Sequence, residues 1–338
     1  MINQSQPRRI AVVLIDGFAL MSLAAVSEPL RAANLLAGRV IYRLDLFHAA
    51  TSDSPARPSA SAIIVKTQPI AAAPDGYDLA FVVAGGNPVG FHHAETSRWL
   101  RRQARRSHIL GGVSGGPAIL ANAGVMDNRR MTVHWEHAAA LAERHPGLML
   151  ERGLYVMDRD RLTCAGGIAP LDMMHALIAE HHGGAFARLV SDWFMHTDIR
   201  PAGGPQRAGL AERYGTTRSV VLSALEAMDN HIADPLSLKQ LAAISGVGDR
   251  QLTRQFRHGL GQSPGRIYRQ LRLDKSRELL RQTDLSITEI AVATGFFNAG
   301  HYATTFKKRY GFSPRRYRLS LEQSEQQRPD DGKAQRPP

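Results

Sequence analysis

The chain has 338 residues, which is long enough for two domains that each bury a core. Its formal net charge is +12, and this charge is unevenly distributed. Residues 219–320 hold 16 Lys and Arg against 8 Asp and Glu, a surplus of 8, so under a third of the chain carries two thirds of the excess. Such asymmetry is expected when one domain faces a polyanion such as nucleic acid, although Arg-rich proteins often have basic surfaces.

Cysteine content and hydropathy bear on the compartment. Cys164 is the single cysteine, so an intramolecular disulfide is excluded and a reducing cytoplasm is expected. The apolar run Ile10–Ile15 is too short for the core of a signal peptide. No stretch approaches the roughly 18–20 apolar residues of a membrane span. We therefore expect a cytoplasmic protein that does not engage a membrane.

The first half of the chain alternates short apolar runs with helical patterns. Short runs bounded by Gly, Asp or Pro are predicted to be buried strands: Ile10–Ile15, Tyr42–Ala49, Leu79–Ala84 and Ile109–Val113. Helices are predicted at Ser22–Leu36, Thr96–Arg105, Pro117–Ala123, Ala169–His181 and Ala185–His196. This alternation predicts an α/β domain with a flavodoxin-like parallel sheet covered by helices on both faces.

Composition also suggests the domain boundaries. The segment Arg200–Gln206 contains two Pro and two Gly and is typical of a linker, which we extend over 200–218. A helix is predicted at Ser219–Ile232, where an all-α domain begins. The predicted organisation is therefore an α/β domain at 1–199, the linker, a helical domain at 219–320 and a disordered tail at 321–338.

The helical domain contains one sequence pattern twice. Gly246 in the first copy corresponds to Gly295 in the second, an offset of 49, whereas Phe256 corresponds to Phe306, an offset of 50. One residue is therefore inserted in the second turn. Repetition at this period indicates a duplicated supersecondary unit, here two helix-turn-helix units. Their predicted helices are Ser237–Ile244 and Asp249–His258 in the first copy, and Ser286–Ala293 and Asn298–Arg309 in the second.

The second helix of each unit is the predicted recognition helix. Leu252 and Phe256 are four residues apart and should face the core, as should Tyr302 and Phe306. The remaining positions should be exposed and contact DNA: Arg250, Gln251, Arg254, Arg257, Asn298, His301, Thr304, Lys307 and Lys308. Arg and Gln can pair bidentately with G or A, whereas lysines near a helix end suit phosphates. A single charged helix would more simply be a solvated face; two in matching positions favour DNA.

These residues resemble a known signature. The run from Gly295-Phe296-Phe297-Asn298 through Phe306-Lys307-Lys308 to Ser313-Pro314 and Tyr317-Arg318 resembles AraC/XylS-type transcriptional regulators. The resemblance covers about residues 219–320 and implies two recognition helices on one face of the DNA. One departure is Gly300, where the family usually has a bulkier polar residue.

A second motif follows the predicted strand Ile109–Val113. Ser114-Gly115-Gly116 leads into a helix that begins with Pro117, and glycines permit a sharp strand-to-helix turn. Such a turn displays one side chain, Ser114, which either acts as a nucleophile or helps to hold a ligand. Gly-rich turns of this kind are also common for purely structural reasons.

The wider pattern in this half also resembles a family. Glu28-Pro29-Leu30-Arg31, Ala84-Gly85-Gly86-Asn87, the Ser114 turn and Thr132-Val133-His134-Trp135-Glu136 resemble the PfpI-like, class I amidotransferase-like sensor domains. With the helical half, the whole chain resembles the GlxA-like branch of AraC/XylS regulators. Enzymatic relatives carry a cysteine at the turn, so Ser114 rules out thiol catalysis at that position.

Two classes of function remain open. The resemblance implies a transcription activator that senses a small nitrogenous compound such as a betaine, carnitine or an arginine-like molecule. The alternative is a PfpI-like hydrolase, amidase or glyoxalase-type enzyme that carries a DNA-binding domain and uses a Ser114–His134 pair. The candidate effector-binding residues are Glu28, Gly86, Asn87, Ser114, Gly115, His134 and Trp135.

Trp135 has two interpretations, a cation–π wall for a cationic ligand or ordinary core packing. The histidines show no metal-ligand spacing that carboxylates support, so we expect neither a metal nor a cofactor. The expected partners are double-stranded DNA, a small-molecule effector, RNA polymerase and a second copy of the chain.

Overall fold

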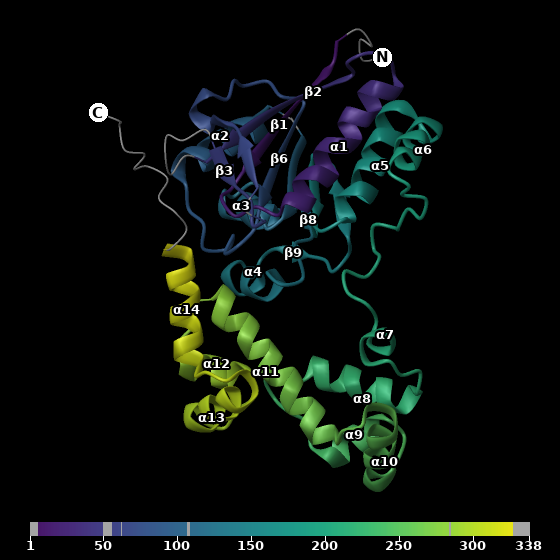
Figure 1. Ribbon diagram of the computed structural model, residues 1–338, viewed down its shortest axis with the longest axis vertical. Helices are drawn as coiled ribbons and strands as arrows, with labels where there is room; N and C mark the ends of the chain where they lie inside the picture. Colours follow the sequence, from purple (N-terminus) through teal and green to yellow (C-terminus); the bar gives the residue numbers. More distant parts are fainter. Residues whose placement is uncertain (1–5, 50–55, 62, 107–108, 284, 327–338) are drawn as a thin grey trace, which may run out of the picture. The chain divides into compact units, whose positions relative to one another are not determined.

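The computed structural model describes residues 6–49, 56–61, 63–106, 109–283 and 285–326 (Figure 1). The chain divides into two compact units, Met1–Gln206 and Arg207–Pro338. The first is built from a sheet with helices and the second from helices. The predicted fold class is confirmed.

Within the described residues, seven strands of the first unit form one sheet, in the order β10-β11-β7-β6-β1-β2-β5. Its neighbours run parallel except the edge pair β10–β11, which is antiparallel. The strands are β1 (Arg8–Leu14), β2 (Tyr42–His48), β5 (Gln68–Pro69), β6 (Leu79–Ala84), β7 (Ile109–Ser114), β10 (Tyr155–Asp158) and β11 (Arg161–Cys164). Short pairs are formed by β3 (Ala56–Pro58) with β4 (Ile64–Lys66), and by β8 (Arg130–Met131) with β9 (Met149–Leu150).

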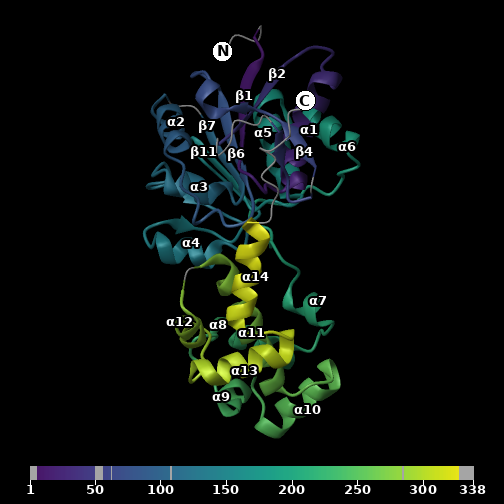
Figure 2. The same ribbon diagram turned by 60° about the vertical axis from the view of Figure 1, so that its left-hand side comes forward.

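Helices cover both faces of the sheet because alternate strand residues point to opposite sides. On β1, Ile10, Val12 and Leu14 pack into one core, while Ala11 and Val13 pack into the other. Figures 1 and 2 show α1, α5 and α6 on the first face and α2 and α3 on the second. The helices of this unit are α1 (Leu20–Leu36), α2 (Ala94–Arg105), α3 (Gly116–Asn122), α4 (Ala138–Arg144), α5 (Ala169–His182) and α6 (Gly184–Trp193), with a 3-10 turn, η1, at Ile70–Ala72.

The segment 200–206, predicted to be part of a linker, is instead fixed to the first unit. Arg200 donates to the buried carboxylate of Asp172 from its backbone N–H at 2.9 Å and from Nη2 at 2.7 Å. Gln206 Nε2 donates to the carbonyl oxygen of Gly153 at 2.8 Å. The second unit therefore starts at Arg207, and its first helix, α7 (Leu210–Tyr214), packs Leu210 and Tyr214 against a core of that unit.

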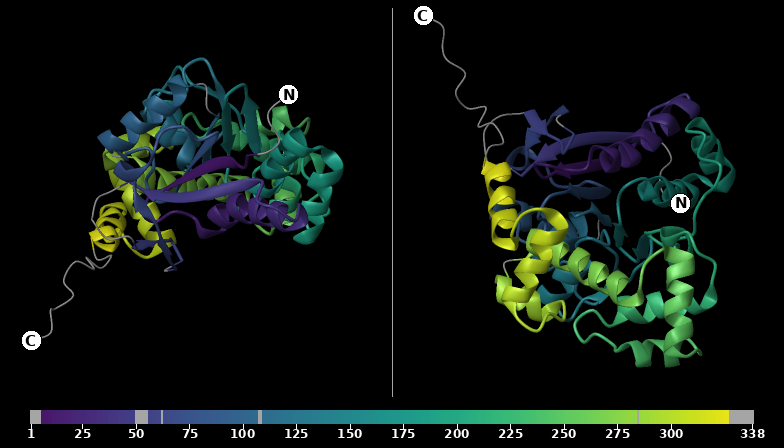
Figure 3. Two further views of the ribbon diagram at one scale, coloured as in Figure 1. Left: turned by 90° about the horizontal axis from the view of Figure 1, so that it is seen from above. Right: turned by 60° about the horizontal axis from the view of Figure 1, so that its bottom comes forward.

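The second unit contains two helical cores that meet on one long helix, α11 (Pro264–Gln282). Leu271 belongs to the first core and Leu273 to the second. Figure 1 and the right-hand view of Figure 3 show α11 running from the group α8–α10 to the group α12–α14. The helices are α8 (Ser219–Asn230), α9 (Leu238–Ile244), α10 (Asp249–Leu260), α12 (Ile287–Ala293), α13 (Ala299–Tyr310) and α14 (Pro314–Gln326).

Helix α14 covers 321–326, where the sequence predicted the start of a disordered tail. The remainder of that predicted tail, 327–338, lies outside the described residues.

The two helix-turn-helix units have the same local construction. Ser237 and Ser286 are the N-caps of α9 and α12, and each forms a complete capping box with Gln240 or Glu289. The glycine of each turn has a positive φ, 70° at Gly246 and 71° at Gly295, which an L side chain rarely adopts. The duplicated pattern in the sequence is therefore a duplicated structure.

Among the described residues, no helix combines the length and apolar character that a membrane span requires.

Candidate effector site and nucleic-acid interface

Ser114 lies at the sharp turn between β7 and α3. Its φ is +61°, an uncommon conformation for a residue other than glycine. Gly116 allows this turn, because a Cβ there would meet the carbonyl oxygen of Val82 at 1.9 Å. Gly115 N–H donates to the carbonyl oxygen of Ala84 at 3.0 Å, which ties the turn to the end of β6. The strand-to-helix turn predicted from the glycines is present.

The surroundings of Ser114 are closely packed, and 7% of the residue is exposed. Gly166 lies so near that a Cβ on it would meet the Ser114 Cβ at 2.6 Å. The next residue, Gly167, donates its N–H to Ser22 Oγ at 3.1 Å. Ser22, in the first turn of α1, is thus bonded to the segment that lies against Ser114, and the sequence pattern shows no sign of this bond because only the fold brings α1 there.

The predicted partner His134 reaches Ser114 through the backbone. His134 N–H donates to the Ser114 carbonyl oxygen at 3.3 Å. The His134 ring accepts at Nδ1 from the backbone N–H of Glu136 at 3.3 Å, within its own turn. The contact with Ser114 therefore fixes position and is not the side-chain hydrogen bond that a Ser–His pair uses for proton transfer.

The other predicted effector residues have varied positions. Glu28 pairs with Arg31 on the surface of α1 at 2.7 Å, with 42% of its side chain exposed, and lies six residues, or about 9 Å, beyond Ser22 along the helix. Asn87 is exposed and accepts from Gly90 N–H at 3.2 Å. The preceding Gly86 has a φ of +63°. Of these predicted residues, Gly115 follows Ser114 directly in the turn, and His134 donates its backbone N–H to the Ser114 carbonyl oxygen.

Trp135 and three titratable residues belong to the segment that follows this backbone contact. The Trp135 ring lies 5.2 Å from the His134 ring, centroid to centroid, and is half-buried. His134, Glu136 and His137 each offer a potential metal-ligating atom within 4.8 Å of the others, a grouping that the sequence analysis did not anticipate. Burial, together with the neighbouring His134, lowers the pKa of His137 to about 4, so its imidazole is neutral at pH 7.

The single cysteine does not replace the missing nucleophile. Cys164 pairs with Val113 in the strand register, one residue before Ser114. Complete burial raises the pKa of its thiol to about 12, so the reactive thiolate is absent at neutral pH.

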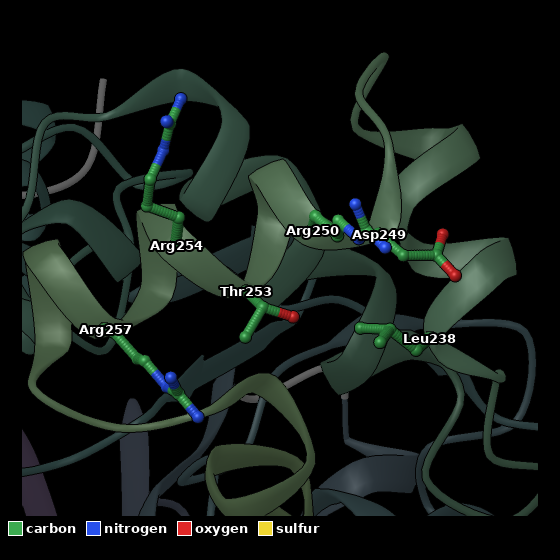
Figure 4. A pocket seen from close by; sticks show the side chains of 6 residues that line it. All are labelled: Leu238, Asp249, Arg250, Thr253, Arg254 and Arg257. Atoms are coloured by element: carbon green, nitrogen blue, oxygen red, sulfur yellow. The ribbon is translucent and has the colours of Figure 1, made fainter.

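The first recognition helix, α10, has the exposure that the spacing predicts. Leu252 and Phe256 are fully buried, and the predicted contact residues of this helix are exposed: Arg250, Gln251, Arg254 and Arg257. An open groove of about 360 Å³ lies along the helix, lined by Leu238, Asp249, Arg250, Thr253, Arg254 and Arg257. Figure 4 shows Arg250 beside Asp249, whereas Arg254 and Arg257 extend in different directions. The three guanidinium groups thus present dispersed positive charge along one helix.

The second recognition helix, α13, differs at its start. Asn298 is the N-cap, and its Oδ1 accepts from His301 N–H at 2.7 Å, so this oxygen is occupied by the helix itself. Tyr302 and Phe306 are fully buried, as predicted. The remaining predicted contact residues of this helix are exposed: His301, Thr304, Lys307 and Lys308.

Helix α11 holds both recognition helices in place. Arg309, near the end of α13, pairs with Asp274 of α11 at 2.9 Å, and Tyr310 donates to the same carboxylate at 2.6 Å. In the first helix-turn-helix, Ile267, Tyr268 and Leu271 of α11 share a core with Leu252 and Phe256 of α10. These contacts fix how the exposed faces of α10 and α13 are presented.

Comparisons with known proteins agree with this architecture. Residues 8–180 match the DJ-1/PfpI family, and residues 241–320 match a helix-turn-helix domain family. The chain is similar to the HTH-type transcriptional regulator GlxA of Rhizobium meliloti, with 42% identity over 91% of this chain and 94% of GlxA. It is also similar to the HTH-type transcriptional regulator CdhR of Pseudomonas aeruginosa, with 36% identity over 91% of each chain.

The chain is also similar to a solved structure of an AraC family transcriptional regulator from Pseudomonas putida, with 26% sequence identity and a TM-score of 0.51. The match covers 56% of this chain and 100% of the chain in that structure. The matching full-length relatives are transcriptional regulators rather than enzymes. A DJ-1/PfpI domain joined to a duplicated helix-turn-helix, over nearly the full length of these regulators, identifies the family. The chain belongs to the GlxA-like branch of AraC-type transcriptional regulators.

Proposed function

We propose that this regulator binds specific operators through both recognition helices and activates transcription in response to a small nitrogenous metabolite. The observation that carries the proposal is the repeated pair of exposed recognition-helix faces, with three arginines along the groove of α10. Arg250, Gln251 and Arg254 lie in the first half of α10, where side chains reach base edges when such a helix enters the major groove. Lys307 and Lys308 lie toward the end of α13 and suit phosphates.

Replacing Arg254 with alanine is expected to reduce discrimination between operator and unrelated duplex by roughly tenfold, because a base-edge contact is lost. Replacing Lys308 with alanine should instead weaken binding to both duplexes by a similar factor. The measurement is a titration of the full chain with both duplexes at several salt concentrations. For the wild type, the logarithm of the binding constant should fall with a slope of about −0.9 per phosphate neutralised.

Equal, sequence-independent losses in the two variants would contradict the assignment of roles. A binding constant that does not depend on salt would contradict DNA binding through this basic surface.

The proposed effector site is the turn at Ser114. Three segments support this choice: Gly166 lies against Ser114, Gly167 is bonded to Ser22, and Trp135 follows His134, whose backbone N–H donates to the Ser114 carbonyl oxygen. Hydroxyl groups together with an aromatic face would suit a small cationic nitrogen compound. Effector binding would change DNA affinity through a coupling free energy between the two units. The alternative, a hydrolase that uses Ser114 and His134, lacks support from relatives that are regulators.

A thermal-shift screen of glycine betaine, carnitine and arginine against the full chain tests this site. A compound at one hundred times its dissociation constant should stabilise the protein by about 2.7 kcal/mol. Ser114→Ala should reduce the shift, whereas Ser27→Ala on α1 is the matched control, because that hydroxyl donates to the Leu23 carbonyl oxygen within its own helix. Conversion of a compound by the wild type, lost in Ser114→Ala, would support the enzymatic alternative.

The proposal also includes a cytoplasmic location, a homodimer and contact with RNA polymerase. The membership of the chain in a family of transcriptional regulators supports these expectations. Sedimentation with and without duplex DNA measures the oligomeric state, and transcription in vitro measures the sign of regulation.

A further inference from the structure

The two turns that precede the recognition helices differ by one residue, and the structure identifies it. In the first turn, Val247 alone separates Gly246 from Gly248, the N-cap of α10. In the second, two residues, Phe296 and Phe297, separate Gly295 from Asn298, the N-cap of α13. Val247 packs against the first core and Phe296 is buried in the second, so these two correspond. The inserted residue is therefore Phe297.

The chain is anchored on both sides of Phe297. The ring of Phe296 is covered by the Arg272 guanidinium, whose carbon lies 4.3 Å from the ring centroid. Arg272 also donates from Nε to the carbonyl oxygen of Thr294 at 2.8 Å. On the other side, the Asn298 side chain caps α13. The backbone position of Phe297 is therefore set by the contacts of the residues on either side of it.

Phe297 is 96% exposed, whereas the neighbouring Phe296 is 3% exposed and Phe306 is fully buried. A single exposed apolar side chain is common and means little alone. Here, however, the exposed ring occupies the only inserted position of the repeat and directly precedes the N-cap of a recognition helix. That end of the helix approaches base edges when a helix-turn-helix binds DNA.

The chemistry around Phe297 favours apolar contacts with DNA. The first recognition helix begins Asp249-Arg250-Gln251, but the second begins Ala299-Gly300-His301, and residues 296–304 contain no Lys, Arg, Asp or Glu. A Cβ at Gly300 would meet only Asn298 Oδ1, at 3.5 Å, so no side chain covers the helix surface at this position. Small residues permit close approach, and Phe can contact the 5-methyl group of thymine in the major groove.

We propose that Phe297 is a specificity-determining residue that recognises a thymine methyl group in the operator half facing α13. The inference rests on the proposed binding of operators by both recognition helices. It assigns base recognition in the second helix-turn-helix to an apolar contact, and it leaves the phosphate contacts to Lys307 and Lys308.

The test starts from duplexes that the full-length wild type selects from a random pool. Each thymine is then replaced in turn by deoxyuridine, which lacks only the 5-methyl group. One replacement in the α13 half should weaken wild-type binding roughly fivefold, on the scale of one buried methyl group. Phe297→Ala should bind the thymine duplex about as weakly and should no longer distinguish thymine from deoxyuridine there. Phe297→Leu should retain part of the discrimination.

Val292→Ala is the matched control, because Val292 is an apolar side chain of the same helix-turn-helix, 64% exposed, but on the support helix α12. It should keep the wild-type response to deoxyuridine. The proposal is overturned if the wild type is indifferent to every methyl group, or if Phe297→Ala keeps the full methyl effect. The proposal is also overturned if Phe297→Ala binds the operator duplex normally but activates transcription poorly. That result would mean that the ring contacts a protein rather than DNA. Failure of the wild type to select any duplex would instead overturn the proposed function.

Discussion

Replacing Asp172 with alanine is expected to lower the free energy of unfolding of the first unit by about 3–5 kcal/mol, the usual result of removing one partner of a buried ion pair. Asp172 is fully buried on α5. Its carboxylate accepts from three donors of Arg200 and lies 2.9 Å from His196 Nε2. Alanine would leave these groups without their acceptor and would release the segment 200–206 from the unit. Chemical denaturation followed by circular dichroism measures the change.

The control for this variant is Glu151→Ala. Glu151 pairs with Arg130 at 3.2 Å, and both side chains are about half exposed. Exposed pairs of this kind contribute about 0–1 kcal/mol. A similar loss in both variants would show that the buried position of Asp172 has no special effect.

Replacing Phe306 with alanine is expected to lower the free energy of unfolding of the second helix-turn-helix by about 3–5 kcal/mol, as for other large-to-small changes in a core. The fully buried ring packs among Tyr302 at 5.7 Å, Tyr310 at 4.5 Å and Tyr317 at 6.0 Å between centroids. The cavity would loosen α13 in its own core, while the first core contains none of these residues. Hydrogen exchange should therefore accelerate in α12–α14 more than in α8–α10.

Phe312→Ala is the matched control, because this ring is 37% exposed and stacks on Tyr317 at 5.5 Å. Phe312→Ala should lower the free energy of unfolding by less than half as much as Phe306→Ala, because the Phe312 ring buries less apolar surface. Uniform acceleration of exchange across both cores in Phe306→Ala would contradict their independence.

Much of the fold could be predicted from local sequence pattern. The strand β6 was predicted because all six of its residues are apolar, as in a strand buried on both faces. The recognition helices were predicted because buried residues four positions apart repeat in both copies. In contrast, β11 was missed because its four buried residues include Arg161 and Thr163, whose polar atoms are satisfied by distant backbone groups such as Val125 and Thr132.

Long-range partners explain the other differences. Two Pro and two Gly made 200–206 typical of a linker, but only the fold shows that Arg200 reaches Asp172. For the same reason, Ser22 was missed at the Ser114 turn. Asn298 stays a predicted DNA contact; its oxygen also caps α13 through a local hydrogen bond from His301, three residues along the chain. Sequence spacing indicates which face is exposed, whereas the partners of Arg200 and Ser22 depend on tertiary structure.

Because α11 is one continuous helix, it fixes the rotation of the two recognition helices relative to each other about its axis. Leu271 and Leu273, two residues apart on this helix, belong to different cores. An α-helix turns by about 100° per residue, so one extra residue between them would rotate one recognition surface about the axis of α11 relative to the other by that angle. Under the proposed binding of operators through both recognition helices, the length of this single helix would set the separation of the two operator halves along the DNA. A change in that length would then adapt the regulator to operators with a different helical phase without altering either proposed DNA-binding surface.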